Sequence, residues 1–260
     1  MKKIAFASLI IISVFISCKN EPDYAEEIKG KWMCNEIDYL IQPTNETFVL
    51  DFLSNGTESI SEGDSLANNL GKSWSINSDF IYSVNEDEIL IEGDNLTGEH
   101  LDISLKIESL TANKFVYTEN HVKVNNVDIT TDKTYILRRC IEDYANQIIG
   151  TWQGRKFFSD DSSTNFYFMI NYKSDNSFDY YLKVNDTWEL ADITGTYFLN
   201  GNLLTMNFLD NSISENNHSY ECWLIDEVTP AQITCWQYNR MPGSDYNLQG
   251  IKYELEKVTQ

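Results

Sequence analysis

The chain contains little of several residue types on which common protein chemistries depend. Its 260 residues include three histidines, four prolines and twelve glycines, and 19 basic residues stand against 40 acidic ones. So few prolines and glycines exclude collagen-like and low-complexity chains. The formal charge of −21 argues against binding to DNA, RNA or an anionic lipid surface, because each of these partners needs a positive patch.

Catalytic motifs are also missing from the sequence. It contains no Gly-x-Ser-x-Gly, no complete Walker loop and no His-Glu-x-x-His. The histidines His100, His121 and His218 lie among polar residues without metal-ligand spacing, and the acidic runs 86–88 and 160–161 are typical of solvated loops. We therefore expect no catalytic residue, metal or cofactor, and no enzyme. A hydrolase built on paired carboxylates is the alternative that a count of acids leaves open.

Only one long apolar run is present, and it stands at the N-terminus. Two lysines are followed by an apolar stretch over 4–16, and a serine and Cys18 come next. A basic start, about a dozen apolar residues and a small residue at the cut are typical of a secretory signal. The run is shorter than the roughly 20 residues of a membrane span. Residues 1–17 are therefore predicted to be a cleaved signal peptide.

The end of this run, Phe15-Ile16-Ser17-Cys18, resembles the lipobox of bacterial lipoproteins, in a bulky apolar variant similar to those of Bacteroidetes. The resemblance implies cleavage before Cys18, acylation of its thiol and a lipidated tether over 18–27. It also implies the outer membrane, because Lys19 is not the acidic residue that would hint at inner-membrane retention. The mature chain keeps 40 acidic and 17 basic residues, a charge of −23, so the lipid is its only expected attachment to the membrane.

An internal repeat divides the rest of the chain. Residues 23–32 and 143–152 share six of ten residues at an offset of 120. Shorter matches follow in the same order through both halves and end with Tyr-x-Leu at 135–137 and 253–255. A period near 120 is too long for a solenoid and is typical of two copies of one domain. The predicted division is a domain over 28–139, a linker over 140–147 and a domain over 148–258.

Short segments rich in β-branched and aromatic residues predict an all-β chain. Examples are residues 46–53, 88–92, 101–107, 165–172, 178–184 and 203–208. Tight-turn signals such as Ser54-Asn55-Gly56 separate them. This pattern favours two tandem antiparallel up-and-down β-barrels, because closure leaves no exposed edge strand. A single helical turn, capped by Asp23 in the first copy, is the expected lead-in to each barrel.

The ordered motifs of each copy resemble those of the lipocalin-like, calycin-type β-barrel domains of Bacteroidetes lipoproteins. These motifs are Ile-x-Gly-x-Trp, an aromatic-rich strand ending in an Asn-Gly-like turn, Gly-x-Tyr or Gly-x-Trp, and a terminal Tyr-x-Leu. In Gly30-x-Trp32 and Gly150-x-Trp152, the glycine lets the strand bend sharply while the indole plugs the closed end of the barrel. The resemblance implies a non-enzymatic protein that holds a small apolar or amphipathic ligand.

Four cysteines remain beyond Cys18, namely Cys34, Cys140, Cys222 and Cys235. Disulfides persist in exported proteins, and four cysteines allow three pairings. Because the first and last strands of an up-and-down barrel are neighbours, we expect Cys34 to pair with Cys140. Cys222 and Cys235 flank an expected hairpin and form the second expected pair. Free thiols are the alternative, and a zinc site lacks any Cys-x-x-Cys or nearby histidine.

Aromatic residues supply the candidates for binding. If the two cysteines of the hairpin oppose each other, Trp223, Trp236 and Tyr238 share its other face. An outward aromatic stripe marks an interface with the other domain or a partner, or a platform on which a sugar ring stacks. The reversed assignment puts these rings inside the barrel. Trp188, isolated in a polar stretch, is a separate candidate.

Two functions follow from these observations. The first is a lipid-anchored binding protein that holds a small apolar or amphipathic ligand in a barrel mouth or between the barrels. The second is a surface module that binds a glycan or a protein through the outward aromatic face. An empty apolar cavity favours the first function, and a filled barrel with outward aromatic rings favours the second. No sequence feature indicates the oligomeric state.

Overall fold

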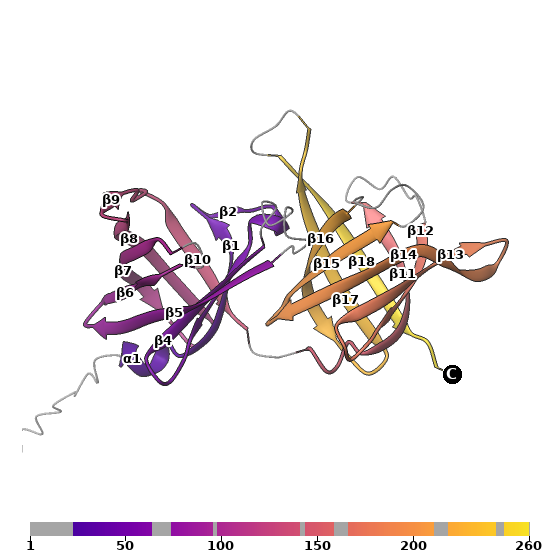
Figure 1. Ribbon diagram of the computed structural model, residues 1–260, viewed down its shortest axis with the longest axis horizontal. Helices are drawn as coiled ribbons and strands as arrows, with labels where there is room; N and C mark the ends of the chain where they lie inside the picture. The colour runs from indigo at the N-terminus through magenta and orange to yellow at the C-terminus, as the bar shows by residue number, and fades with distance from the viewer. Residues whose placement is uncertain are drawn as a thin grey trace, which may run out of the picture.

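Antiparallel strands form most of the regular structure (Figure 1). The computed structural model describes residues 23–63, 74–95, 98–140, 144–158, 166–210, 218–242 and 247–259. The predicted signal peptide, Cys18 and the tether up to residue 22 lie outside the described residues. Figure 1 shows two barrel-like units side by side, the N-terminal one in indigo to magenta and the C-terminal one in orange to yellow.

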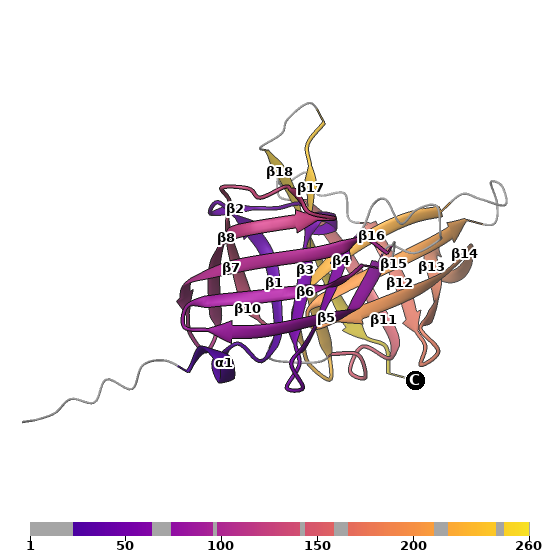
Figure 2. The same ribbon diagram turned by 60° about the vertical axis from the view of Figure 1, so that its left-hand side comes forward.

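Eight strands of the first unit form a closed cycle. They are β1 (Gly30–Ile37), β3 (Phe48–Phe52), β4 (Thr57–Gly63), β5 (Trp74–Asn85), β6 (Glu88–Asp94), β7 (His100–Leu110), β8 (Lys114–Val124) and β10 (Thr134–Arg139). Each strand pairs with the next, and β10 closes the cycle because it pairs with both β8 and β1. Two short strands extend it: β2 (Leu40–Ile41) pairs with β1, and β9 (Val127–Asp128) with β8. In Figure 2, β5 to β8 cross the front of this unit in chain order.

The second unit is a closed barrel of eight strands in simple chain order. They are β11 (Gly150–Phe158), β12 (Phe166–Tyr172), β13 (Ser177–Val184), β14 (Thr187–Asn200), β15 (Leu203–Asp210), β16 (His218–Val228), β17 (Gln232–Arg240) and β18 (Leu248–Lys257). All neighbours are antiparallel, and β18 closes the barrel by pairing with β11. The predicted all-β fold of antiparallel up-and-down barrels is confirmed. Closure pairs the backbone groups that an open sheet would leave at its edges.

A buried tryptophan sits at the same place in each unit. Trp32 and Trp152 are both 0% exposed. The indole nitrogen of Trp32 donates a hydrogen bond to the carbonyl oxygen of Ile28 at 2.5 Å, and Trp152 donates in the same way to Ile148 at 2.6 Å. Each indole therefore buries its apolar body and still satisfies its one polar group. The repeat seen in the sequence is thus a repeat of one structural element.

A cation from the end of each unit covers the same tryptophan. The guanidinium carbon of Arg139 lies 4.0 Å from the centre of the Trp32 ring, and the ammonium of Lys257 lies 4.1 Å from that of Trp152. Both cations also donate to backbone carbonyls, Arg139 to Lys29 and Lys257 to Ile149, each at 2.6 Å. Cation–π contact and hydrogen bonding together tie the last strand of each unit to its first.

The lead-in to each unit is one turn long. In the first unit it is α1 (Tyr24–Glu27), where Asp23 accepts a hydrogen bond from the backbone nitrogen of Glu26 at 3.3 Å, as predicted for the helix cap. The strand that follows starts at Gly30 with φ of +105°, and its counterpart Gly150 has φ of +122°. Residues with a side chain rarely adopt such angles, so both glycines are needed for the turn into the strand.

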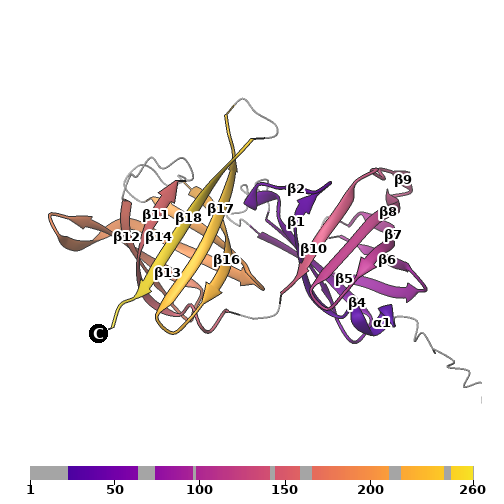
Figure 3. The same cartoon turned by 180° about the vertical axis from the view of Figure 1, so that it is seen from behind.

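The two units share a small apolar interface. Met33 of β1 and Val49 of β3 pack with residues of β15 and β16, namely Leu203, Cys222 and Leu224. Figure 3, seen from behind, shows β16 and β17 on the side of the second unit that faces β1. These contacts lie outside both barrel cores, because alternate residues of a strand point to opposite faces of its sheet.

Polar contacts add to this interface around η1 (Thr44–Glu46). The hydroxyl of Thr44, 1% exposed, accepts a hydrogen bond from the backbone nitrogen of Tyr238 at 2.6 Å. Glu46 forms an ion pair with Arg240 at 2.6 Å. The interface therefore fixes β17 of the second unit against the first unit by both apolar and polar contacts.

The predicted disulfides are not present, because all four described cysteines are free thiols. In the first unit the register of β1 against β10 pairs Cys34 with Leu137, three residues before Cys140. At a rise of about 3.3 Å per residue, this offset separates the two thiols along the strand. The neighbouring strands were predicted correctly, but the register was wrong.

A similar offset separates the second pair. Cys235 lies opposite Ile225, three residues from Cys222. Because an odd offset turns side chains to the opposite face, Cys235 joins the barrel core while Cys222 contacts the first unit.

The free thiols predict a simple chemical test. Burial raises the pKa of Cys34 and Cys222 to about 12, so very little reactive thiolate is present at neutral pH. We expect the folded chain 19–260 to react slowly with a thiol reagent. After denaturation without reductant, four thiols should titrate. A count of two or none in the denatured chain would show that disulfides form after all.

Candidate functional site

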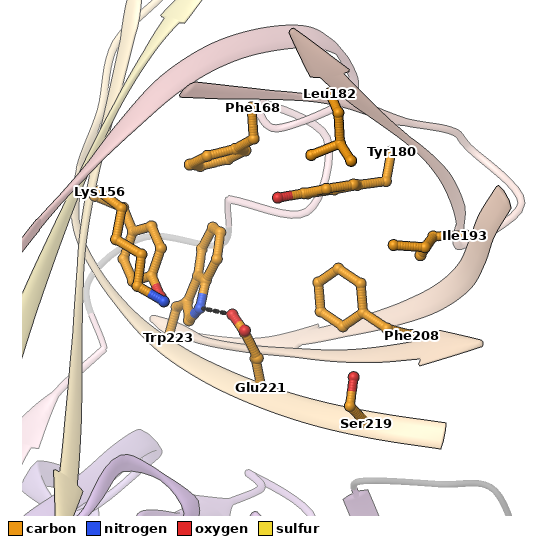
Figure 4. A pocket seen from close by; sticks show the side chains of 10 residues that line it. Lys156, Phe168, Tyr180, Leu182, Ile193, Phe208, Ser219, Glu221 and Trp223 are labelled. Carbon is orange, nitrogen blue, oxygen red and sulfur yellow. Dashed lines mark hydrogen bonds between the residues drawn. The ribbon is translucent and has the colours of Figure 1, made fainter. Parts of the chain in front are cut away.

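The second barrel contains a cavity of about 390 Å³ at its interior (Figure 4). Its lining comes from seven of the eight strands: Lys156, Phe168, Tyr180, Leu182, Ile193, Phe208, Ser219, Glu221, Trp223 and Tyr253. The volume lies in the range of small-molecule sites, about 300–1,000 Å³. Figure 4 shows Phe168, Tyr180 and Leu182 on one side of the space and Ser219 and Glu221 on the other.

Aromatic rings form most of the cavity wall. Trp223 and Tyr253 stack with ring centres 4.0 Å apart, and Phe168 meets each of them edge-on at 6.1 Å. Tyr180 stacks on Phe168 at 5.9 Å, and Phe208 meets Tyr180 edge-on at 5.8 Å. Such contacts stabilise each ring by about 0.5–1.5 kcal/mol beyond its burial, so the wall is preorganised.

One carboxylate faces this aromatic wall. The indole nitrogen of Trp223 donates to Oε2 of Glu221 at 2.9 Å, and it is the only donor to that side chain among the described residues. Burial raises the pKa of Glu221, and the positive charge of Lys156 together with the indole hydrogen bond offsets part of this rise. Lys156 also lines the cavity, with its ammonium 5.6 Å from the centre of the Tyr253 ring.

Burial also raises the pKa of two phenols in the wall, Tyr180 and Tyr253. Both are therefore neutral at physiological pH, and the hydroxyl of Tyr253 donates to the side-chain oxygen of Gln237 at 2.7 Å. In Figure 4 the hydroxyl of Tyr180 points into the open space. The described lining thus offers a ligand aromatic faces, the phenol of Tyr180, the carboxylate of Glu221 and the ammonium of Lys156.

The raised pKa of Glu221 predicts a pH-dependent stability. In the folded state this carboxyl holds its proton to a higher pH than its ordinary pKa of 4.5, so the folded state binds more protons than the unfolded state above that value. The free energy of unfolding contributed by Glu221 therefore falls as pH rises above 4.5. We expect Glu221→Gln to be more stable than the wild type at pH 7 and equal to it at pH 3.

Urea unfolding at both pH values measures this difference. Glu227→Gln is the matched control, because Glu227 lies on the same strand but is exposed. Equal stability of Glu221→Gln and the wild type at pH 7 would contradict the prediction.

The structure separates the predicted aromatic candidates. Trp223 points into the barrel and is 2% exposed, whereas Trp236 and Tyr238 lie half-buried on the outer face of β17 with parallel rings 6.0 Å apart. The prediction that Trp223 shares their face was wrong, because the register of β16 against β17 is offset by three residues from the expected one. The alternative interior position is the one that the structure shows for Trp223.

The two outward rings line a cleft of about 330 Å³ between the units. Residues of both units line it, including Asn35, Glu36, Arg138, Asp226, Trp236 and Tyr238. Glu36 and Arg138 form an ion pair at 2.6 Å. The side-chain oxygen of Asn35 is buried and has no hydrogen-bond partner among the described residues.

Trp188 lies apart from both sites. It stands in β14 opposite Lys183, half-buried, where β13 and β14 extend beyond the barrel in Figure 1. An outer groove of about 340 Å³ includes Trp188 and Tyr167, whose ring carries the Arg155 guanidinium at 5.0 Å. The structure does not bring Trp188 together with the other predicted residues.

The sequence analysis missed most of the cavity residues. Glu221 stands between aromatic and apolar residues in Tyr220-Glu221-Cys222-Trp223, and an acid in such a strand is the signal that was available. Phe168, Tyr180 and Tyr253 carry no such signal, since aromatic residues at alternating positions are also typical of a filled core.

The described residues contain no group of histidines, cysteines and acids arranged to hold a metal ion. Two of the histidines have carboxylate partners instead: His100 contacts Asp94 at 3.0 Å and His121 contacts Asp102 at 2.9 Å. No helix in the described part of the chain has the length and apolar character needed to cross a membrane.

Comparison with known proteins gives distant structural likenesses. No family model and no curated protein matches the chain. A lipocalin-like protein from Bacteroides uniformis is 14% identical over 43% of this chain and 99% of that one, with a TM-score of 0.32. The endo-1,5-alpha-L-arabinanase from Thermotoga petrophila is 10% identical over 81% of this chain and 65% of that one, with a TM-score of 0.25.

A third solved structure, the transferrin binding protein B from Neisseria meningitidis, is 8% identical. That match covers 82% of this chain and 65% of the other, with a TM-score of 0.26. At these identities and TM-scores the structural similarities do not support a function for this chain. The proposed function therefore rests on the site itself.

Proposed function

We propose that the chain is a binding protein whose second barrel holds a small amphipathic ligand. The observation that carries this proposal is the cavity of about 390 Å³, whose described lining has aromatic walls and the carboxylate of Glu221. The apolar body of a ligand would replace water against the rings of Phe168, Phe208 and Trp223, which is the main source of affinity in such sites. A polar head would meet Glu221. No part of this function requires a chemical reaction.

The sequence supports a place for this function in the cell. The lipobox-like ending at Cys18 and the excess of acidic over basic residues favour a mature chain held at the outer membrane by its lipid alone. The tether would place both barrels outside the bilayer, where a ligand can enter from water. Labelling with a radioactive fatty acid in the native host, compared with Cys18→Ser, measures this anchor.

A cavity-filling substitution tests the proposed function. Ile193 lines the cavity, and Leu190, on the same strand, is 62% exposed. With N-phenyl-1-naphthylamine as a neutral fluorescent probe, we expect Ile193→Trp to lower the affinity about tenfold or more, because the added indole occupies the space. Leu190→Trp should bind like the wild type. Equal affinity of all three proteins would overturn the proposal.

The cleft between the units supports a second candidate function, the binding of a glycan. Parallel rings of Trp236 and Tyr238 offer stacking faces for a sugar, and the ion pair of Glu36 with Arg138 adds polar groups to the same cleft. A glycan array probed with the wild type and with Trp236→Ala measures this function. Binding of the same glycans by both proteins would exclude the cleft as the glycan-binding site.

A further inference from the structure

The carboxylate of Glu221 accepts few hydrogen bonds for a buried charged group. Its oxygen Oε2 accepts the hydrogen bond from Trp223, while no described residue donates to Oε1 or forms an ion pair with the carboxylate. A carboxylate withdrawn from water normally has several donors or a cationic partner, and without them its burial costs free energy. A ligand that supplies the missing donor would recover that free energy on binding.

The aromatic rings around Glu221 indicate which kind of ligand group would donate to it. Trp223, Tyr180 and Phe168 present ring faces within one continuous network of contacts, and Phe208 extends it. Ring faces carry partial negative charge, so they attract cations, and aromatic cages bind ammonium groups for this reason. The carboxylate and the rings therefore favour the same kind of ligand group.

We propose that the ligand is an amphipathic amine, whose protonated nitrogen lies against Glu221 and whose apolar body fills the rest of the aromatic cavity. This rests on the proposed function of the cavity as a binding site. The ammonium would donate a hydrogen bond to Oε1, and its remaining charge would face the rings of Tyr180 and Trp223.

The other charge of the lining does not favour an anionic ligand. The ammonium of Lys156 lies 5.6 Å from the centre of the Tyr253 ring, and its positive charge already acts on Glu221. A carboxylate ligand near Lys156 would bring a second negative charge into the cavity with Glu221, and like charges in such surroundings repel strongly. The formal charge of −21 on the whole chain also draws cations rather than anions toward it.

Three ligands of equal chain length test the proposal: n-octylamine, 1-octanol and octanoate, each titrated calorimetrically at pH 7.5. For the wild type we expect octylamine to bind about tenfold or more tightly than octanol, since a charge-assisted hydrogen bond is strong where water is excluded. Octanoate should bind more weakly than octanol. Glu221→Gln should remove the advantage of octylamine over octanol.

Glu227→Gln is the matched control, because it removes the same charge from an exposed position of the same strand and should leave all three affinities unchanged. Octanol or octanoate binding as tightly as octylamine, or an octylamine affinity unaffected by Glu221→Gln, would overturn the amine proposal while the binding cavity stands. If none of the three binds the wild type, the proposed function of the cavity fails as well.

Discussion

Replacing Trp152 by alanine lowers the free energy of unfolding of the second barrel by about 3–5 kcal/mol, the usual cost of removing a large buried aromatic side chain. Trp152 is 0% exposed, and three contacts depend on its indole. These are the core packing, the hydrogen bond to Ile148 and the stacked ammonium of Lys257. In the variant a cavity opens in the core of the barrel, and the cation loses its aromatic partner.

Denaturant unfolding followed by near-ultraviolet circular dichroism measures this change. Trp32→Ala should destabilise the first unit by a similar amount, because Trp32 has the same burial, hydrogen bond and cation. Trp188→Ala is the control, since this half-buried ring on an extended hairpin should cost less than about 1 kcal/mol. Equal losses for Trp152→Ala and Trp188→Ala would show that the buried indole does not stabilise the barrel more than a half-buried one.

Gly195→Ala is expected to cost about 3 kcal/mol, near the upper end for an overpacked core. A Cβ atom at Gly195 would lie 2.3 Å from the backbone oxygen of Asn207 and 2.3 Å from the ring of Phe178. The backbone contact cannot be relieved by a change of side-chain conformation. Phe178, 1% exposed, covers this glycine from the neighbouring strand, so the substitution also pushes a core ring out of place.

Gly250→Ala provides the matched comparison on another strand of the same barrel. Its added Cβ would meet the ring of Tyr238 at 3.4 Å, which is an ordinary van der Waals distance. We expect a change below about 1 kcal/mol in urea unfolding. If Gly195→Ala were as mild as Gly250→Ala, the close packing of Phe178 over Gly195 would be refuted.

The architecture of two β-barrels could be predicted from the sequence, because the strands and the start of each barrel are marked by local sequence patterns. Alternating apolar residues and tight turns mark the strands, and the repeated Gly-x-Trp marks the start of each unit. The extended hairpin that carries Trp188 was missed, although Asn185 and Asp186, with φ of +48° and +64°, form the kind of two-residue turn that such residues favour. The first strand of this hairpin, over 178–184, was predicted from the sequence, and no strand was assigned to the polar stretch that contains Trp188.

The candidate site was less accessible from the sequence because it depends on register. An error of three residues between β16 and β17 moved Trp223 from the barrel interior to the surface and brought Cys222 opposite Cys235. No local signal fixes such an offset, since both faces of these strands carry apolar residues: one faces the barrel core, and the other contains Leu224 and faces the first unit. The pairing of Trp223 with Glu221 could therefore only be found in the structure.

Native mass spectrometry of the chain 19–260, purified from the export pathway of its own host, tests the central claim most directly. Wild-type protein should carry one small lipophilic molecule per chain, released on collisional activation, and Ile193→Trp should appear at its bare mass because its cavity is filled. Leu190→Trp should keep the molecule. The same adduct on Ile193→Trp as on the wild type, or a bare mass for all three proteins, would contradict a ligand held in the second barrel.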